Sequence, residues 1–251
     1  MTALATKHDT IRRLQKEILS LHGNGSVRDG QPIRTGLGPL EQAFPQQTFP
    51  TAAVHEFIST GPADAAATSG FITGLLHHLA TGSTGPCIWI GTHRTTYPPA
   101  LQGLGLLPHR VVFVDVATER DALWTAEEAL KCEGLTAVVC EVSGLSFTQS
   151  RRLQLAVEES RVTGFIHRRN PRAEGTNACV SRWHISPMSS VLQDGVPGVG
   201  HPRWRVALQK IRNGHPGTWH LQWTGNEFQH VPLFTVTTLA AGMPPAKQKV
   251  A

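Results

Sequence analysis

The residues of this sequence that come closest to a chemical motif lie between Gly61 and Gly70. An apolar run ends there in a Gly-Pro turn, followed by small residues and the hydroxyl pair Thr68-Ser69. A strand that leads through such a turn into a helix can bind phosphate, because the N–H groups at the start of a helix lack partners within it. The phosphate-binding pattern G-x-x-x-x-G-K-[ST], however, requires a lysine. No basic residue stands between Thr60 and Leu76, so the loop has the shape of a nucleotide site without its chemistry.

We therefore predict a vestigial loop with no catalytic residue, no ATPase activity and no bound cofactor, formed by Gly61, Thr68, Ser69 and Gly70. Residual nucleotide binding without turnover stays open. Glu141 follows an apolar run and could hold a metal ion, but a glutamate at a strand end is more often bonded to nearby backbone. No metal site is predicted, because the 13 histidines are scattered and the adjacent pair His77-His78 would point about 100° apart on a helix.

The positive charge of the chain is concentrated in its second half. Residues 151–212 hold eleven Lys or Arg against four acidic residues, within a chain of net charge +5. This asymmetry favours contact with a polyanion, although a solvated basic surface explains it equally well. The candidate DNA-binding residues are Arg168, Arg169 and Arg172 in a turn-rich loop after a predicted strand, and Arg203, Arg205, Lys210 and Arg212 in a predicted hairpin.

The hairpin is predicted from two strand-like runs near residues 204–208 and 218–223, joined through Asn213 to Gly217. Its tryptophans, Trp204, Trp219 and Trp223, could stack on single-stranded nucleic acid beside the basic side chains. The alternative is that tryptophans at strand spacing pack on the core while the basic residues protect an edge strand.

Three runs of the chain are apolar at every position, which is typical of parallel strands covered on both faces. They are Cys87–Gly91, Val111–Val114 and Ala137–Cys140. A helix capped by Thr118 should end before Gly134, and the next should run from near Thr148 to Gly164 and lead into a strand at 165–167. This alternation predicts an α/β fold with a mostly parallel sheet flanked by helices.

Residues 9–21 predict an amphipathic helix with one apolar side, formed by Ile11, Leu14, Ile18 and Leu21. The polar stretch that follows would detach this helix from the body, so its apolar side is a candidate surface for a partner or a neighbouring subunit. Packing on its own domain is the alternative. We divide the chain into an N-terminal helix and linker (1–30), a core with the C-terminal hairpin (31–237) and a flexible tail (238–251).

Composition argues against membrane and secreted classes. No apolar run approaches the roughly 20 residues that span a bilayer, and the first ten residues lack a hydrophobic signal core. The four cysteines contain no C-x-x-C pair, which suits buried thiols in a reducing compartment. We expect a cytoplasmic protein without a membrane partner, and homo-oligomerisation stays open.

Seven stretches of the chain, spread over roughly residues 30–225, together resemble the ImuA family. They are Thr35–Leu40, Ala53–Glu56, Glu119–Trp124, Glu127–Leu135, Ser150–Ala156, Arg161–Ile166 and Pro202–Arg205. The resemblance implies a RecA-like fold and a non-catalytic adaptor role in damage-induced, error-prone translesion DNA synthesis (SOS mutagenesis). It implies an ImuB-like protein as direct partner, with an error-prone DNA polymerase and the sliding clamp as indirect ones. RecA and single-stranded DNA are further candidates.

In RecA-like enzymes, the strand at 87–91 would lead to the catalytic glutamate and the strand at 137–140 to a magnesium-linked aspartate. This chain has Thr92-His93-Arg94 and Glu141 there. With the lysine also missing, three parts of the phosphoryl-transfer machinery are altered, so a DNA-stimulated ATPase is the weaker alternative. A SulA-like cell-division inhibitor is another alternative, but this chain is longer than that role requires.

Overall fold

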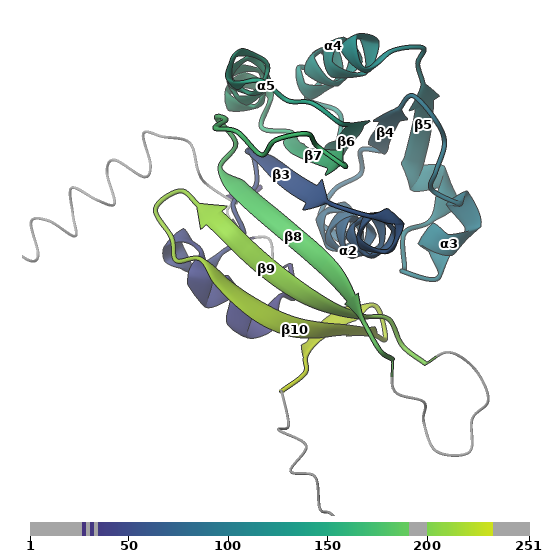
Figure 1. The fold of residues 1–251 in the computed structure, drawn as a ribbon, viewed down its shortest axis with the longest axis vertical. Coiled ribbons are helices and arrows are strands. Elements are labelled where there is room, and N and C mark those ends of the chain that lie inside the picture. The colour runs from purple at the N-terminus through teal and green to yellow at the C-terminus, as the bar shows by residue number, and fades with distance from the viewer. Residues whose placement is uncertain (1–26, 29–30, 33–34, 191–199, 233–251) are drawn as a thin grey trace, which may run out of the picture.

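The computed structural model describes residues 27–28, 31–32, 35–190 and 200–232, and Figure 1 shows their arrangement. Its centre is a nine-stranded sheet with the strand order β11-β10-β9-β8-β3-β7-β6-β4-β5. The predicted helix at 9–21, with Ile11, Leu14, Ile18 and Leu21, and the tail from 238 onward lie outside the described residues.

One half of the sheet is parallel. Its strands are β3 (Val54–Ser59), β4 (Cys87–Gly91), β5 (Val111–Asp115), β6 (Ala137–Val142) and β7 (Thr163–Arg169). The three fully apolar runs are the strands β4, β5 and β6, which confirms that prediction. The prediction that both faces of the strand are covered is wrong for β5, because this strand lies at the edge of the sheet and its Val112 is 49% exposed.

The other half of the sheet is antiparallel. Strand β8 (Ser181–Met188) lies parallel to β3 and antiparallel to β9 (Arg203–Ile211), which continues into β10 (Gly217–Thr224) and β11 (Glu227–His230). The predicted hairpin is confirmed as β9 and β10. The third strand, β11, was not predicted, because its four residues are polar except for Phe228. A separate pair, β1 (Val27–Arg28) and β2 (Gln31–Pro32), precedes the sheet.

The helices cover the two faces of the sheet unequally. The long helix α2 (Pro62–Thr81) packs on one face with the short 3-10 helices η1 (Gly38–Ala43) and η2 (Pro45–Gln47). On the other face, α4 (Glu119–Leu130) and α5 (Phe147–Ser160) pack only against the parallel half (Figure 1). The short helices α3 (Pro98–Gln102) and η3 (Pro108–Arg110) connect β4 to β5. In the part of the chain that the structure describes, no helix is long and apolar enough to cross a membrane.

The ends of the helices follow from local side-chain chemistry. Thr118 caps α4 as predicted, since its side chain accepts the backbone N–H of Asp121. Helix α5 begins at Phe147, where Ser146 and Gln149 form a reciprocal capping box. It ends at Ser160, earlier than the predicted Gly164, because Arg161 adopts a left-handed conformation with φ of 66°.

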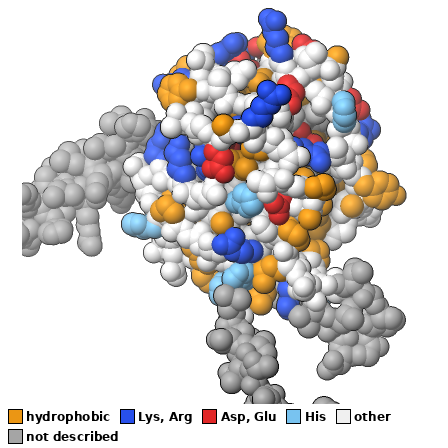
Figure 2. Space-filling view, viewed as in Figure 1, with side chains coloured by type: hydrophobic (Ala, Val, Ile, Leu, Met, Phe, Trp, Pro, Cys, Tyr) orange, Lys and Arg blue, Asp and Glu red, His pale blue; other side chains and the backbone are white. Residues whose placement is uncertain are grey.

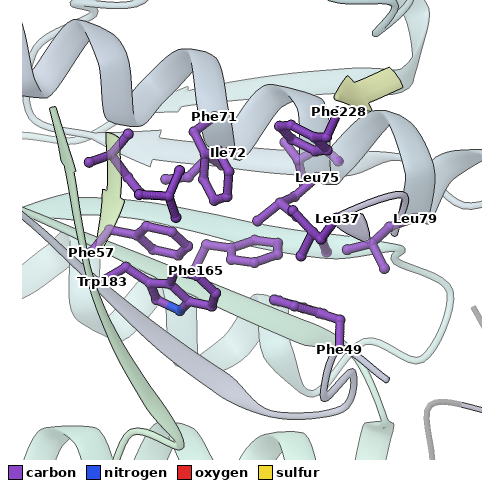
Figure 3. Close-up of a cluster of buried hydrophobic side chains, with 14 of the residues drawn as sticks. Leu37, Phe49, Phe57, Phe71, Ile72, Leu75, Leu79, Phe165, Trp183 and Phe228 are labelled. Atoms are coloured by element: carbon purple, nitrogen blue, oxygen red, sulfur yellow. The ribbon is translucent and has the colours of Figure 1, made fainter. Parts of the chain in front are cut away.

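The larger core is aromatic and lies beneath α2. Figure 3 shows Phe71 and Ile72 of that helix above Phe57, Phe165 and Trp183 of the sheet, and all five are fully buried. Farther along the helix, Gly74 allows the rings of Phe228 and Trp223 to approach its backbone. The helix is thereby held against both halves of the sheet.

Candidate functional site

The junction of β3 and α2 is tighter than the sequence suggested. Only Thr60 and Gly61 separate the strand from the helix, which begins at Pro62. The predicted loop of Gly61, Thr68, Ser69 and Gly70 is therefore wrong beyond Gly61, since the other three residues lie within α2. The physical reason is that Ala63 to Ala67 are mostly good helix formers and extend the helix toward the strand.

The start of α2 presents a carboxylate where a phosphate would need positive potential. Asp64 lies in the first turn, and the Thr60 hydroxyl donates to its Oδ2 at 2.9 Å. A carboxylate at this position interacts favourably with the helix dipole and repels a second anion. The junction thus lacks both the loop length and the charge of a phosphate site.

Glu141, at the end of β6, is buried and bonded to side chains. Its carboxylate accepts hydrogen bonds from Trp89 Nε1 at 2.9 Å and Thr95 Oγ1 at 3.0 Å, and it pairs with Arg169 Nη1 at 3.2 Å. The expectation that it bonds to backbone is wrong. Among the described residues, no group of three or more His, Cys, Asp or Glu side chains could hold a metal ion.

A chain of hydroxyl and imidazole groups lies beside Glu141. The Ser59 hydroxyl lies 2.9 Å from both His167 Nε2 and Thr68 Oγ1, and all three side chains are buried. Burial, reinforced by the charge of Arg169, lowers the pKa of His167 to about 3, so the ring is neutral at pH 7. Because Ser59 is 1% exposed, a substrate could not reach it, and these groups position α2 on the sheet.

A cavity of about 360 Å³ opens next to these groups, between α2 and the segment that contains α3. Small residues of α2 line one side, and residues 95–97 and Leu101 line the other, with Arg169 among the lining residues. Ligands of open α/β sheets bind at the carboxyl ends of the strands, where this cavity lies. Its volume suits a small ligand. Its charged lining side chain, Arg169, is already paired with Glu141.

The structure contradicts the assignment of Arg168 and Arg169 to a mobile DNA-contacting loop, because both lie in β7. The guanidinium of Arg168 is buried and pairs with Glu56 at 2.7 Å. Arg169 turns inward and donates to Thr95 and Glu141. Arg172 does lie in the loop after β7, is exposed, and makes no hydrogen bond or ion pair with a described residue.

The basic residues of the hairpin are placed differently from one another. Lys210 and Arg212 donate to the carbonyls of Asn177 and Ala178 at 3.1 and 3.2 Å. Arg203 donates to Gln222 at 2.6 Å. Arg205 is exposed and has no hydrogen-bond or ion-pair partner among the described residues. The stacking hypothesis is wrong for the tryptophans at 204 and 223, which are buried in the core, and the third, at 219, packs against it.

The sequence reasoning missed the most buried ion pair among the described residues, which joins Glu56 to Arg168. Glu56 is fully buried in β3 and accepts from Arg168 and from Arg182, whose Nε lies 2.6 Å from Glu56 Oε2. The signal was available, because a glutamate inside an apolar strand needs a cationic partner. Its partners could not be identified, since they lie 112 and 126 residues away in the sequence.

Comparison with known proteins agrees with this architecture. No family model matches the sequence. Protein ImuA from two strains of Caulobacter vibrioides is 34% identical over 194 residues, covering 73% of this chain and 80% of the relative. The crystal structure of the RadB recombinase superposes with a TM-score of 0.53 over 80% of this chain and 100% of that chain, and at 14% identity it supports the fold alone. With a RecA-like α/β fold and this identity over most of its length, the chain belongs to the ImuA family.

Proposed function

We propose that this protein is a non-catalytic adaptor in damage-induced, error-prone translesion DNA synthesis, acting with an ImuB-like protein and an error-prone DNA polymerase. The observation that carries the proposal is the 34% identity to Protein ImuA over 194 residues. The proposed location is the cytoplasm.

The geometry of the carboxyl ends of the strands supports a role without ATP turnover. Phosphoryl transfer requires a phosphate cradle, a lysine, a magnesium ligand and a group that activates the nucleophile. Here only two residues separate β3 from the helix, Asp64 occupies the first turn of the helix, and Glu141 is paired with Arg169. The ATPase alternative would require all three features to rearrange.

The proposed docking elements for the ImuB-like partner are the apolar stripe Ile11, Leu14, Ile18 and Leu21 and the segment from Thr238 onward. Burying an aliphatic side chain stabilises a contact by about 2 kcal/mol. Two aspartates in the stripe should therefore cost about 4 kcal/mol, or roughly a thousandfold in Kd. The described strands of the nine-stranded sheet lie within residues 54–230, so we expect variants of either docking element to keep the fold.

The experiment measures binding of the full chain to the purified ImuB-like protein by calorimetry. Leu14→Asp with Ile18→Asp should weaken binding by about a thousandfold, and deletion from Thr238 onward should also weaken it. Arg13→Gln with Ser20→Asp is the matched control, because it changes the charge of the same segment equally on its other side. Parent-like binding by every variant would reject these surfaces. Binding to FtsZ and not to the ImuB-like protein would favour the SulA-like alternative and reject the adaptor role.

A further inference from the structure

Half of one sheet face carries no helix among the described elements. Helices α4 and α5 cover only the parallel strands of this face. Beyond those strands, the outer side chains of β8, β9 and β10 face solvent, and Figure 2 views this surface from the front. We define the open sheet face by the outward residues of these strands: Arg182, His184, Ser186, Met188, Arg203, Arg205, Ala207, Lys210, Thr218, His220, Gln222 and Thr224. Their inward neighbours belong to the aromatic core beneath α2.

The open sheet face is continuous across strands. Arg205 stands in register with Ser186 of β8 and His220 of β10, and Lys210 stands opposite Arg182. Because β9 lies between two strands, its backbone fixes the spacing of the cations. Arg203 and Arg205 point the same way two residues apart, about 7 Å along the strand.

The charges at the two sides of this face differ in how they are neutralised. Arg168 and Arg182 are balanced by Glu56 and Glu174, which lie within ion-pair distance. Lys210, Arg212 and Arg203 donate only to uncharged oxygens, which fix the side chains without cancelling their charge.

Two further cations complete this set. Arg205, at the centre of the open sheet face, and Arg172, in the adjoining loop, have no hydrogen-bond or ion-pair partner among the described residues. Together with Arg203, Lys210 and Arg212 they form an unneutralised strip. Strands β10 and β11 contain one acidic residue, Glu227. It stands opposite Thr224, the last residue of β10, and so does not face the cations of β9 in register.

The side chains around the strip fit a phosphate backbone better than a protein. A stable protein interface needs an apolar or aromatic centre. The exposed large hydrophobic side chains of the described residues all lie between Tyr97 and Leu155, and none lies in β8, β9, β10 or β11. Four of the five unneutralised cations are arginines, whose planar guanidinium matches a phosphate in two-point contact.

We propose that the open sheet face, with Arg172, Arg203, Arg205, Lys210 and Arg212, binds the phosphate backbone of nucleic acid. Of the three arginines predicted to contact DNA after the strand at 165–167, this site keeps only Arg172, because Arg168 and Arg169 lie in β7 and pair with Glu56 and Glu141. Because the outward strand residues include no Phe, Tyr or Trp and only the two imidazoles of His184 and His220, we expect phosphate contacts to dominate and binding to depend little on sequence. The inference goes beyond the proposed adaptor role and does not depend on it.

The test measures the salt dependence of binding of labelled 30-nucleotide dT and dA single strands to the full chain by anisotropy. Five contacts would give a log–log slope of at most about −3.5, at about −0.7 for each phosphate contact. Arg203→Gln with Arg205→Gln should flatten the slope by about 1.4, which means an approximately sevenfold smaller loss of affinity between 50 and 200 mM salt. Arg120→Gln, in α4, with Lys131→Gln, at the C-cap of that helix, is the control of equal charge and should leave the slope unchanged.

The absence of base stacking is tested with the same protein and an abasic DNA strand. An abasic strand of the same length should bind within about threefold of dT, because phosphates alone are contacted. If the double variant fails to fold, Arg172→Gln alone should still flatten the slope by about 0.7.

Several results would overturn the inference. They are an unchanged slope in a folded variant, equal effects of the control, loss of binding to the abasic strand, or no DNA binding at low salt. Displacement of DNA by polyglutamate at equal charge concentration would assign the face to an acidic protein instead. Since no ImuB-like protein is present in this assay, each of these results leaves the adaptor role to its own experiment.

Discussion

Replacing Arg168 by alanine tests whether this residue is structural or contacts DNA. Its guanidinium donates to Glu56 Oε1 at 2.7 Å and to the carbonyls of Glu174 and Ala173 at 3.0 and 2.7 Å. The side chain therefore joins a buried carboxylate to the loop after β7. Its loss should destabilise the fold and detach that loop.

The size of the effect follows from the burial of both partners. The side chain of Glu56 is 0% exposed and that of Arg168 is 4% exposed. Removing one member of a buried ion pair costs about 3–5 kcal/mol, because the other is left with an uncompensated charge. Since Arg182 still neutralises Glu56 from the other side, we expect about 3 kcal/mol for Arg168→Ala.

Urea unfolding followed by far-UV circular dichroism measures this change. Arg172→Ala is the matched control, because it removes an exposed arginine four residues away and should shift the free energy of unfolding by no more than about 0.5 kcal/mol. Adding Glu56→Gln to Arg168→Ala should not recover the loss, because Arg182 Nε would then lose its carboxylate partner at 2.6 Å. Equal stability of Arg168→Ala and Arg172→Ala would refute the structural role.

Three further predictions concern other parts of the molecule. Gly74→Ala should lower the free energy of unfolding by about 1–3 kcal/mol through overpacking, because the added Cβ would lie 2.6 Å from an atom of the Phe228 ring. Gly82→Ala is the control and should be close to neutral in the same urea assay, because no atom lies within 4 Å of its Cβ. Burial lowers the pKa of His55 to about 4 and that of His167 to about 3, below the unfolded value of 6.5. The unfolded chain therefore binds more protons below that value, and stability should fall from pH 6.5 toward pH 4 by up to about 1.4 kcal/mol per pH unit for each ring; a urea midpoint that stays constant between pH 7 and 5 would contradict this. Finally, phosphate release from ATP should not exceed a buffer control with or without single-stranded DNA, and DNA-stimulated release that Glu141→Gln abolishes would show that turnover occurs.

The strands of the parallel half could be predicted because burial on both faces leaves a local pattern. The runs at β4 and β6 are apolar at nearly every position, which neither a loop nor a surface helix would show. The α/β class followed from this alternation, and its RecA-like form followed only from the family resemblance.

The surroundings of the charged side chains could not be predicted, because they depend on contacts between distant segments. Arg168 follows an apolar strand in the sequence and looks like the start of a basic loop, yet its partner Glu56 comes from a strand 112 residues earlier. The prediction of a loop between Gly61 and Gly70 failed for a different reason. Small residues suit a loop and a closely packed helix equally well, and only contacts such as that of Gly70 with Trp204 distinguish them.

The position of α2 has a consequence for cooperativity. This helix packs against β3 and β7 of the parallel half and against β8, while its glycines receive rings from β9, β10 and β11. If either half of the sheet separated from α2, the aromatic surface beneath that helix would therefore be exposed to water. Regions that share a buried element in this way open together in hydrogen exchange. We therefore expect the antiparallel half to open together with the parallel strands that α2 covers, rather than as a separable appendage.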